Sequence, residues 1–143
     1  KIEIVKDNNS EEIESHKFII ATGSKPSTLP NVIIDKNRII SSTEALALSS
    51  LPESLIVIGG GVIGCELASV YARLGTKIKI IEYMPALIAS MDADLGKGLL
   101  TILKNMGIDV YLSHKVISVV ADANNVTVTA TDKYEKSSEF KAE

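Results

Sequence analysis

The residues best suited to chemistry are three glycines and one acid in the middle of the chain. Gly59, Gly61 and Gly64 have the spacing G-x-G-x-x-G, directly after an apolar run over residues 55–58. Glu82 ends the next apolar run, at about the distance of 20 residues that separates loop and acid in dinucleotide sites. A glycine loop brings backbone N–H groups close to a pyrophosphate, and a carboxylate at a strand end accepts hydrogen bonds from ribose hydroxyls. The pattern predicts dinucleotide binding, with no catalytic side chain.

Each glycine of this loop meets a separate physical demand. Gly59 permits a tight turn after the strand, Gly61 leaves room for a phosphate beside the backbone, and Gly64 lets a helix pack close to the sheet. The first N–H groups of that helix have no partner inside it and carry the positive end of its dipole. The candidate cofactor-binding loop consists of Gly59, Gly60, Gly61, Val62, Ile63 and Gly64.

The acid also indicates which nucleotide is bound. A carboxylate at Glu82 would repel a 2′-phosphate, and neither Arg nor Lys occurs from residue 80 to residue 96. The sequence therefore favours NAD(H) over NADP(H). Two alternatives from the same pattern stay open: a glycine turn in another α/β fold with an acid nearby by chance, and a methyltransferase that binds S-adenosylmethionine.

The elements around the loop predict an α/β fold with a Rossmann-like, doubly wound parallel sheet. The run over residues 55–58 does not alternate, which is typical of a strand buried on both faces. Apolar residues at helical spacing predict a helix over 62–74, and Asp92 is a suitable N-cap for another over 93–106. The remaining strands are expected at 77–82, 108–112, 116–121 and 126–130, with Asn124-Asn125 as a hairpin turn.

The N-terminal third carries weaker signals. Strands are expected at 1–5 and 17–21, with turn residues at 7–10 and a loop over 24–38. Ser41 and Glu44 have capping-box spacing, which predicts a short helix through residue 48.

Composition excludes several classes of function. The net charge of −3 does not supply the basic face of a nucleic-acid-binding protein, and no apolar run reaches the length of a membrane span. Cys65, the only cysteine, excludes an intrachain disulfide and fits a reducing compartment such as the cytoplasm. No metal-ligand spacing is found. The first residue is Lys, and we expect a piece of a longer protein.

Two further titratable residues lie near the loop. Glu66 follows Gly64 closely, and by spacing alone it is an acid that favours a helix N-terminus. Cys65 could have a lowered pKa there, but a packed helical residue is the simpler interpretation. His16 and His114 have no catalytic partner nearby in the sequence and are expected on the surface or in loops.

Three longer segments resemble a known family. They read IIATGSKPSTLP, IISSTEALALSSLPESLIVIGGGVIGCELASVYARLGTKIKIIE and GIDVYLSHKV. Together they are similar to the central part of the flavoprotein disulfide reductases, most closely to the dihydrolipoamide dehydrogenase branch. The resemblance extends from residue 18 to about residue 130, and its motifs occur in the family's order.

The resemblance implies roles for particular residues. Thr22, Gly23 and Ser24 match a segment that passes close to FAD in the parent enzyme. The glycine loop and Glu82 match the NAD pyrophosphate and ribose sites, and Glu66 matches an acid near the nicotinamide. Val116 matches a position whose backbone lies near the adenine. The resemblance also implies an antiparallel meander over one face of the sheet.

It further implies a division of the chain: residues 1–38 as a flanking FAD-domain segment with a linker, and residues 39–143 as the NAD-binding domain. The family's redox cysteine pair, first FAD motif and C-terminal His–Glu pair are missing, so we expect an inactive fragment of an NAD- and FAD-dependent oxidoreductase. Its expected partners are NAD(H) and the rest of the parent, a homodimer. A related flavoenzyme, such as an NADH oxidase or mercuric reductase, and a non-catalytic NAD-sensing module stay open.

Overall fold

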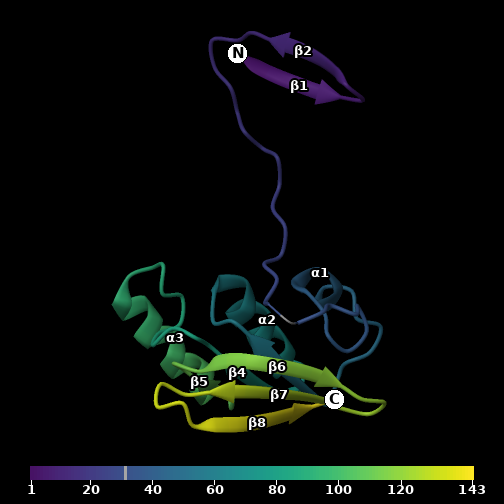
Figure 1. The fold of residues 1–143 in the computed structure, drawn as a ribbon. Coiled ribbons are helices and arrows are strands. Elements are labelled where there is room, and N and C mark those ends of the chain that lie inside the picture. Colours follow the sequence, from purple (N-terminus) through teal and green to yellow (C-terminus); the bar gives the residue numbers. More distant parts are fainter. Residues whose placement is uncertain (31) are drawn as a thin grey trace.

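A parallel three-stranded sheet is the centre of the computed structural model, which describes residues 1–30 and 32–143. Its strands are β3 (Ser54–Ile58), β4 (Lys77–Ile81) and β5 (Asp109–Tyr111), hydrogen-bonded in that order. Helices α2 (Val62–Arg73) and α3 (Ala93–Asn105) cover one face, and an antiparallel sheet covers the other (Figure 1). The predicted α/β class with a Rossmann-like parallel sheet is confirmed.

Two apolar cores lie on the two faces of this sheet. Ile78 and Ile80 of β4 pack against α2 and α3, whereas Ile81 belongs to the core on the opposite side. Every residue of β3 is at least partly buried, as its unbroken apolar run predicts. The buried members of the helix-side core are Ala45, Cys65, Ala68, Tyr71, Ile78, Ile80, Leu87, Leu103 and Ile108.

The covering sheet is the expected antiparallel meander, formed by β6 (Lys115–Ala121), β7 (Val126–Thr131) and β8 (Ser137–Ala142). Strand β8 was not predicted, because only Phe140 and Ala142 are apolar in it. Both are buried and both alternate with exposed neighbours. This alternation of apolar and polar residues is the pattern in the sequence from which β8 could have been predicted.

The double winding expected of the parallel sheet is not seen among the described residues. The three strands follow one another in chain order, so the order does not reverse. After β5 the chain forms the antiparallel meander on the other face, instead of adding a further parallel strand beside β3.

The N-terminal hairpin lies apart from these layers, at the end of an extended segment (Figure 1). Strands β1 (Ile2–Lys6) and β2 (Asn9–Ile13) pair through Asp7 and Asn8, whose φ angles of 51° and 63° suit a tight hairpin turn. Strand β2 was missed because it has one apolar residue. The predicted strand over 17–21 is wrong: the segment has no partner strand and is exposed along its whole length.

The predicted capping box is present at α1 (Ser42–Ala45), where Ser41 caps the helix and Glu44 returns the contact. The helix ends before residue 48, because the Ala45 carbonyl accepts the Tyr71 hydroxyl rather than an N–H of a further turn. Most other predicted elements are confirmed, with ends that shift by one residue. Residue 31, inside the predicted 24–38 loop, lies outside the described residues. No helix in the described ranges is long and apolar enough for a bilayer.

We expect the carboxyl groups of Asp122 and Asp132 to titrate below their ordinary value of 3.8. Backbone N–H groups, first those of Asn124 and Tyr134, hydrogen-bond to them and lower the pKa of each. Since the folded-state pKa lies below the unfolded one, their stabilisation is complete above about pH 5 and is lost as the pH falls through the folded pKa. NMR titration of the carboxyl carbons measures both values; a pKa at or above 3.8 contradicts this account.

Candidate functional site

The candidate site lies where the parallel strands end at one edge of the sheet. Gly59 N–H, just after β3, donates to Ile81 at the end of β4 over 2.9 Å. Glu82 N–H then donates to Tyr111 at the end of β5 over 2.8 Å. These bonds bring the glycine loop and the acid together, as parallel strands require.

The glycine loop has a different constraint at each glycine. Gly59 has a φ of +108°, which favours glycine at the turn. Gly61 has a φ of −73°, and a methyl group built on it would meet nothing within 4 Å. At Gly64 the same methyl group would lie 2.3 Å from the Gly59 carbonyl oxygen, so the helix approaches the loop as closely as only glycine permits.

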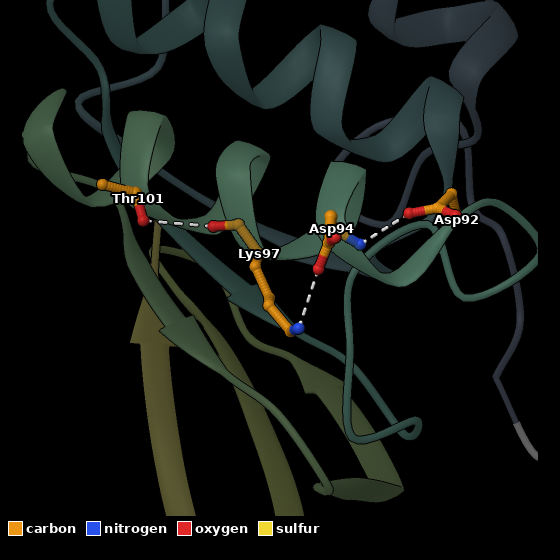
Figure 2. A network of polar contacts seen from close by, with 4 residues as sticks. All are labelled: Asp92, Asp94, Lys97 and Thr101. Carbon is orange, nitrogen blue, oxygen red and sulfur yellow. Dashed lines mark hydrogen bonds and ion pairs between the residues drawn. The ribbon is translucent and has the colours of Figure 1, made fainter.

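Helix α2 differs from the other described helices at its N-terminus. Ser41 caps α1, and Asp92 caps α3 by accepting the Asp94 N–H, beside an exposed Asp94–Lys97 ion pair (Figure 2). Helix α2 has Gly61 as its N-cap residue, so it has no side-chain cap, and its first turn contains no acid. Its first N–H groups are thus left for an anion.

Glu82 points back toward the glycine loop. One carboxylate oxygen accepts the Gly60 N–H and the other accepts the Met84 N–H, each over 2.5 Å. The residue is half-buried, and its carboxylate stands at the end of β4, where the dinucleotide pattern places a ribose acceptor.

Val116 lies two residues beyond a backbone contact at this edge, and its side chain packs against the meander-side core. His114 N–H donates to the Glu82 carbonyl over 2.9 Å, and β6 begins at the next residue. Lys115, Ile117 and Tyr83 line an open cavity of about 670 Å³ next to this contact. The loop position expected for His114 is confirmed, although its ring is half-buried against Tyr111 and Phe140.

Glu66 lies one turn further along α2, with an exposed side chain. It lines a cavity of about 300 Å³ between α2 and α3, together with Val62, Cys65, Ile88 and Met91. Ser69 and Arg73 of α2 also line this cavity, so it holds one acidic and one basic side chain among mostly apolar ones.

Cys65 is a packed residue rather than a reactive thiol. Its side chain is 3% exposed, and its sulfur lies 3.4 Å from the Gly60 carbonyl oxygen. Burial first, and then the negative charge of Glu82, raises the pKa of the Cys65 thiol to about 11. The thiol is therefore neutral at physiological pH and supports the back of the loop.

Thr22, Gly23 and Ser24 are not gathered at this edge. They lie in the exposed extended segment between β2 and α1, and Gly23 has a φ of +79°. The structure adds instead Leu87 and Ile88, which contact Gly60 from the loop after β4. Nothing in the local sequence marked them, because the contact joins segments far apart in the chain.

We expect Gly64→Ala to destabilise the fold by about 1–3 kcal/mol, because its methyl group meets backbone that cannot easily move. Gly98→Ala is the matched control in α3, where a methyl group meets nothing within 4 Å. This helix-interior change should stabilise by about 0.5–1 kcal/mol. Urea unfolding measures both; equal effects at the two positions would refute the close approach at Gly64.

Comparison with known proteins adds a family to this geometry. The sequence profile described as pyridine nucleotide-disulphide oxidoreductase matches residues 1–143. The mitochondrial dihydrolipoyl dehydrogenase of Dictyostelium discoideum is 45% identical over 126 residues, which are 87% of this chain and 26% of the relative. That of Schizosaccharomyces pombe is 43% identical over 116 residues, 81% of this chain and 23% of the relative. A leghemoglobin reductase of Glycine max is 40% identical, with 82% and 22% covered.

Solved structures agree with these matches. The HOCl-induced flavoprotein disulfide reductase RclA of Escherichia coli has a TM-score of 0.71 at 30% identity, covering 85% of this chain and 27% of RclA. LpdA of Mycobacterium tuberculosis has a TM-score of 0.72 at 28% identity, covering 93% of this chain and 28% of LpdA. The chain spans about a quarter of the length of the curated relatives it matches. It belongs to the pyridine nucleotide-disulphide oxidoreductase family.

Proposed function

We propose that this chain binds NAD(H) at the edge formed by the glycine loop and Glu82. The observation that carries the proposal is the combination of an uncapped α2 N-terminus with a strand-end carboxylate held next to it. An anion and a pair of ribose hydroxyls would meet complementary groups there. Under this proposal residues 39–143 are the nucleotide-binding domain.

The described residues divide the work among the parts of the nucleotide. The N–H groups of Gly61, Val62 and Ile63 would face the pyrophosphate, where open space beside Gly61 admits it. The Glu82 carboxylate would accept the ribose hydroxyls. The adenine would extend toward the backbone of Val116, at the cavity that begins beside Tyr83.

The preference for NAD(H) rests in this proposal on Glu82 itself. Arg and Lys are absent near Glu82 in the sequence, but two lysines lie near it in the folded chain. Lys115 and Lys133 line the cavity that Tyr83 also lines. A 2′-phosphate would therefore find cations in the neighbourhood, but it would also meet the Glu82 carboxylate at short range. NAD(H) is preferred only if the repulsion of the 2′-phosphate by Glu82 exceeds its attraction to these lysines.

At the level of the whole protein, we propose an NAD- and FAD-dependent oxidoreductase of the dihydrolipoamide dehydrogenase type (EC 1.8.1.4). The bound nicotinamide would exchange hydride with the flavin. Glu66 would lie near the nicotinamide, and Thr22, Gly23 and Ser24, within residues 1–38, would lie near FAD. The 143-residue chain alone is expected to bind NAD(H) weakly and to turn nothing over. The parent would be a homodimer.

For its location we propose a reducing compartment rather than the cytoplasm specifically. The chain has one cysteine, which is unpaired and buried. Several of its relatives, those of Dictyostelium discoideum and Schizosaccharomyces pombe among them, are named as mitochondrial, so a mitochondrial location is as consistent with the sequence as a cytoplasmic one.

We expect the chain to bind NADH more tightly than NADPH, and Glu82→Arg to reduce or reverse this preference. The substitution replaces a group that repels a 2′-phosphate with one that pairs with it. Calorimetric titration of both variants with both nucleotides measures the change. If Glu82→Arg keeps the preference for NADH, Glu82 does not determine which nucleotide binds. If neither the wild-type chain nor the variant binds NADH, the proposal for the isolated chain is contradicted.

We expect Gly61→Ala to weaken NADH binding at least about tenfold, because the methyl group would occupy the space through which the pyrophosphate approaches. The same change should leave the free energy of unfolding nearly unaltered, since Gly61 has an ordinary φ and no close neighbour. Titration and urea unfolding of the same variant test the two statements. Full NADH affinity in Gly61→Ala would show that the phosphate does not pass this residue.

A further inference from the structure

Gly60 is the one residue of the glycine loop, residues 59–64, that is buried. Its N–H donates to Glu82 Oε2 over 2.5 Å, and its carbonyl oxygen accepts the Ile88 N–H over 2.8 Å. A methyl group built on Gly60 would lie 2.5 Å from Leu87 Cδ2 and 3.2 Å from Glu82 Cβ and Cγ, so both side chains pack close to the Gly60 Cα. The loop after β4 therefore holds both peptide groups of Gly60.

The Glu82 main chain is itself fixed from two directions. Its N–H donates to Tyr111 of β5, and its carbonyl accepts the His114 N–H from the connection to β6. Its second carboxylate oxygen is occupied by the Met84 N–H. Because its main chain is fixed and both carboxylate oxygens accept hydrogen bonds, the Glu82 side chain can hold the glycine loop at a fixed position relative to β4.

The loop after β4 also carries backbone strain at its contact with Gly60. Ile88 has a φ of +42°, a conformation that a β-branched residue rarely adopts. Its N–H is the group that binds the Gly60 carbonyl, and Leu87 before it is 1% exposed. Strain of this kind persists only where neighbouring contacts impose it, so the enclosure of Gly60 is a constraint on the fold.

We propose that Glu82 is a positioning residue that braces the glycine loop in the absence of nucleotide, in addition to accepting the ribose hydroxyls. By binding the Gly60 N–H, the carboxylate turns that group inward and leaves the N–H groups of Gly61, Val62 and Ile63 to face the anion. A loop already held in its binding conformation loses less conformational freedom when the ligand binds. The nucleotide part of this inference rests on the proposed function, whereas the bracing of Gly60 does not.

Amide hydrogen exchange in the nucleotide-free chain tests the brace directly. We expect the Gly60 amide to exchange at least about tenfold faster in Glu82→Ala, since it loses its acceptor. Glu82→Gln keeps one acceptor oxygen and should give an intermediate rate. The amides of Ile80 and Val128, one in each core, should keep their wild-type rates and so report that the fold is intact.

Asp122→Asn is the matched control, because Asp122 also accepts two backbone N–H groups, those of Asn124 and Asn125. It should alter exchange in its own turn and leave Gly60 unchanged. Wild-type exchange at Gly60 in a folded Glu82→Ala or Glu82→Gln chain would overturn the brace. If Glu82→Ala fails to fold, the exchange rate of the Gly60 amide in Glu82→Gln tests the brace instead.

Inorganic pyrophosphate separates the brace from ribose binding, because it has no ribose. If Glu82 only accepts ribose hydroxyls, removing its charge should leave pyrophosphate affinity equal or higher. If it braces the loop, Glu82→Ala should bind pyrophosphate several-fold more weakly, despite the removed repulsion. Faster Gly60 exchange in the Glu82 variants, in a chain that does not bind NADH, would support the brace and reject the proposed function. Wild-type Gly60 exchange in these variants, in a chain that binds NADH, would reject the brace and support the proposed function.

Discussion

The close approach of α2 to the end of β3 is the constraint on which the candidate site depends. At Gly64 the helix lies against the Gly59 carbonyl, in a space that excludes even a methyl group. This contact sets where the helix begins, and therefore where its first unpaired N–H groups are presented. A helix displaced by the width of one side chain would move those groups away from the strand edge where Glu82 ends β4.

The site is assembled from strand ends rather than from neighbouring residues. Gly59, Glu82 and His114 come from three separate segments, and the hydrogen bonds from Gly59 to Ile81 and from His114 to Glu82 join them. The meander contributes on the opposite face by burying Ile56 and Ile58 of β3, which keeps the strand that carries the loop in place. Both cores therefore support the same edge of the sheet, and the unpaired amides proposed to bind the anion belong to the helical layer.

Much of this arrangement could be predicted from the sequence, and the reasons are local. The glycine spacing, the apolar run before it and the caps at Ser41 and Asp92 each act within a few residues. Strand β8 and the contact of Ile88 with Gly60 depend on distant partners and leave little trace in sequence. The exposed segment over 17–21 is the opposite case, a strand that was predicted but is not formed. Its apolar residues predict a strand, but no partner strand lies beside it.

Strand β4 places neighbouring isoleucines in different cores, Ile80 toward the helices and Ile81 toward the meander. A slip of one residue would turn each side chain to the opposite face. At Ile80 and Ile81 such a slip would leave an isoleucine in one core and bring a charged residue, Lys79 or Glu82, into the other. At the position that Ile78 fills, a slip in either direction would bring a lysine into the helix-side core. The alignment of the strand that carries Glu82 is thus set by the charged residues that flank and separate its isoleucines, Glu82 among them.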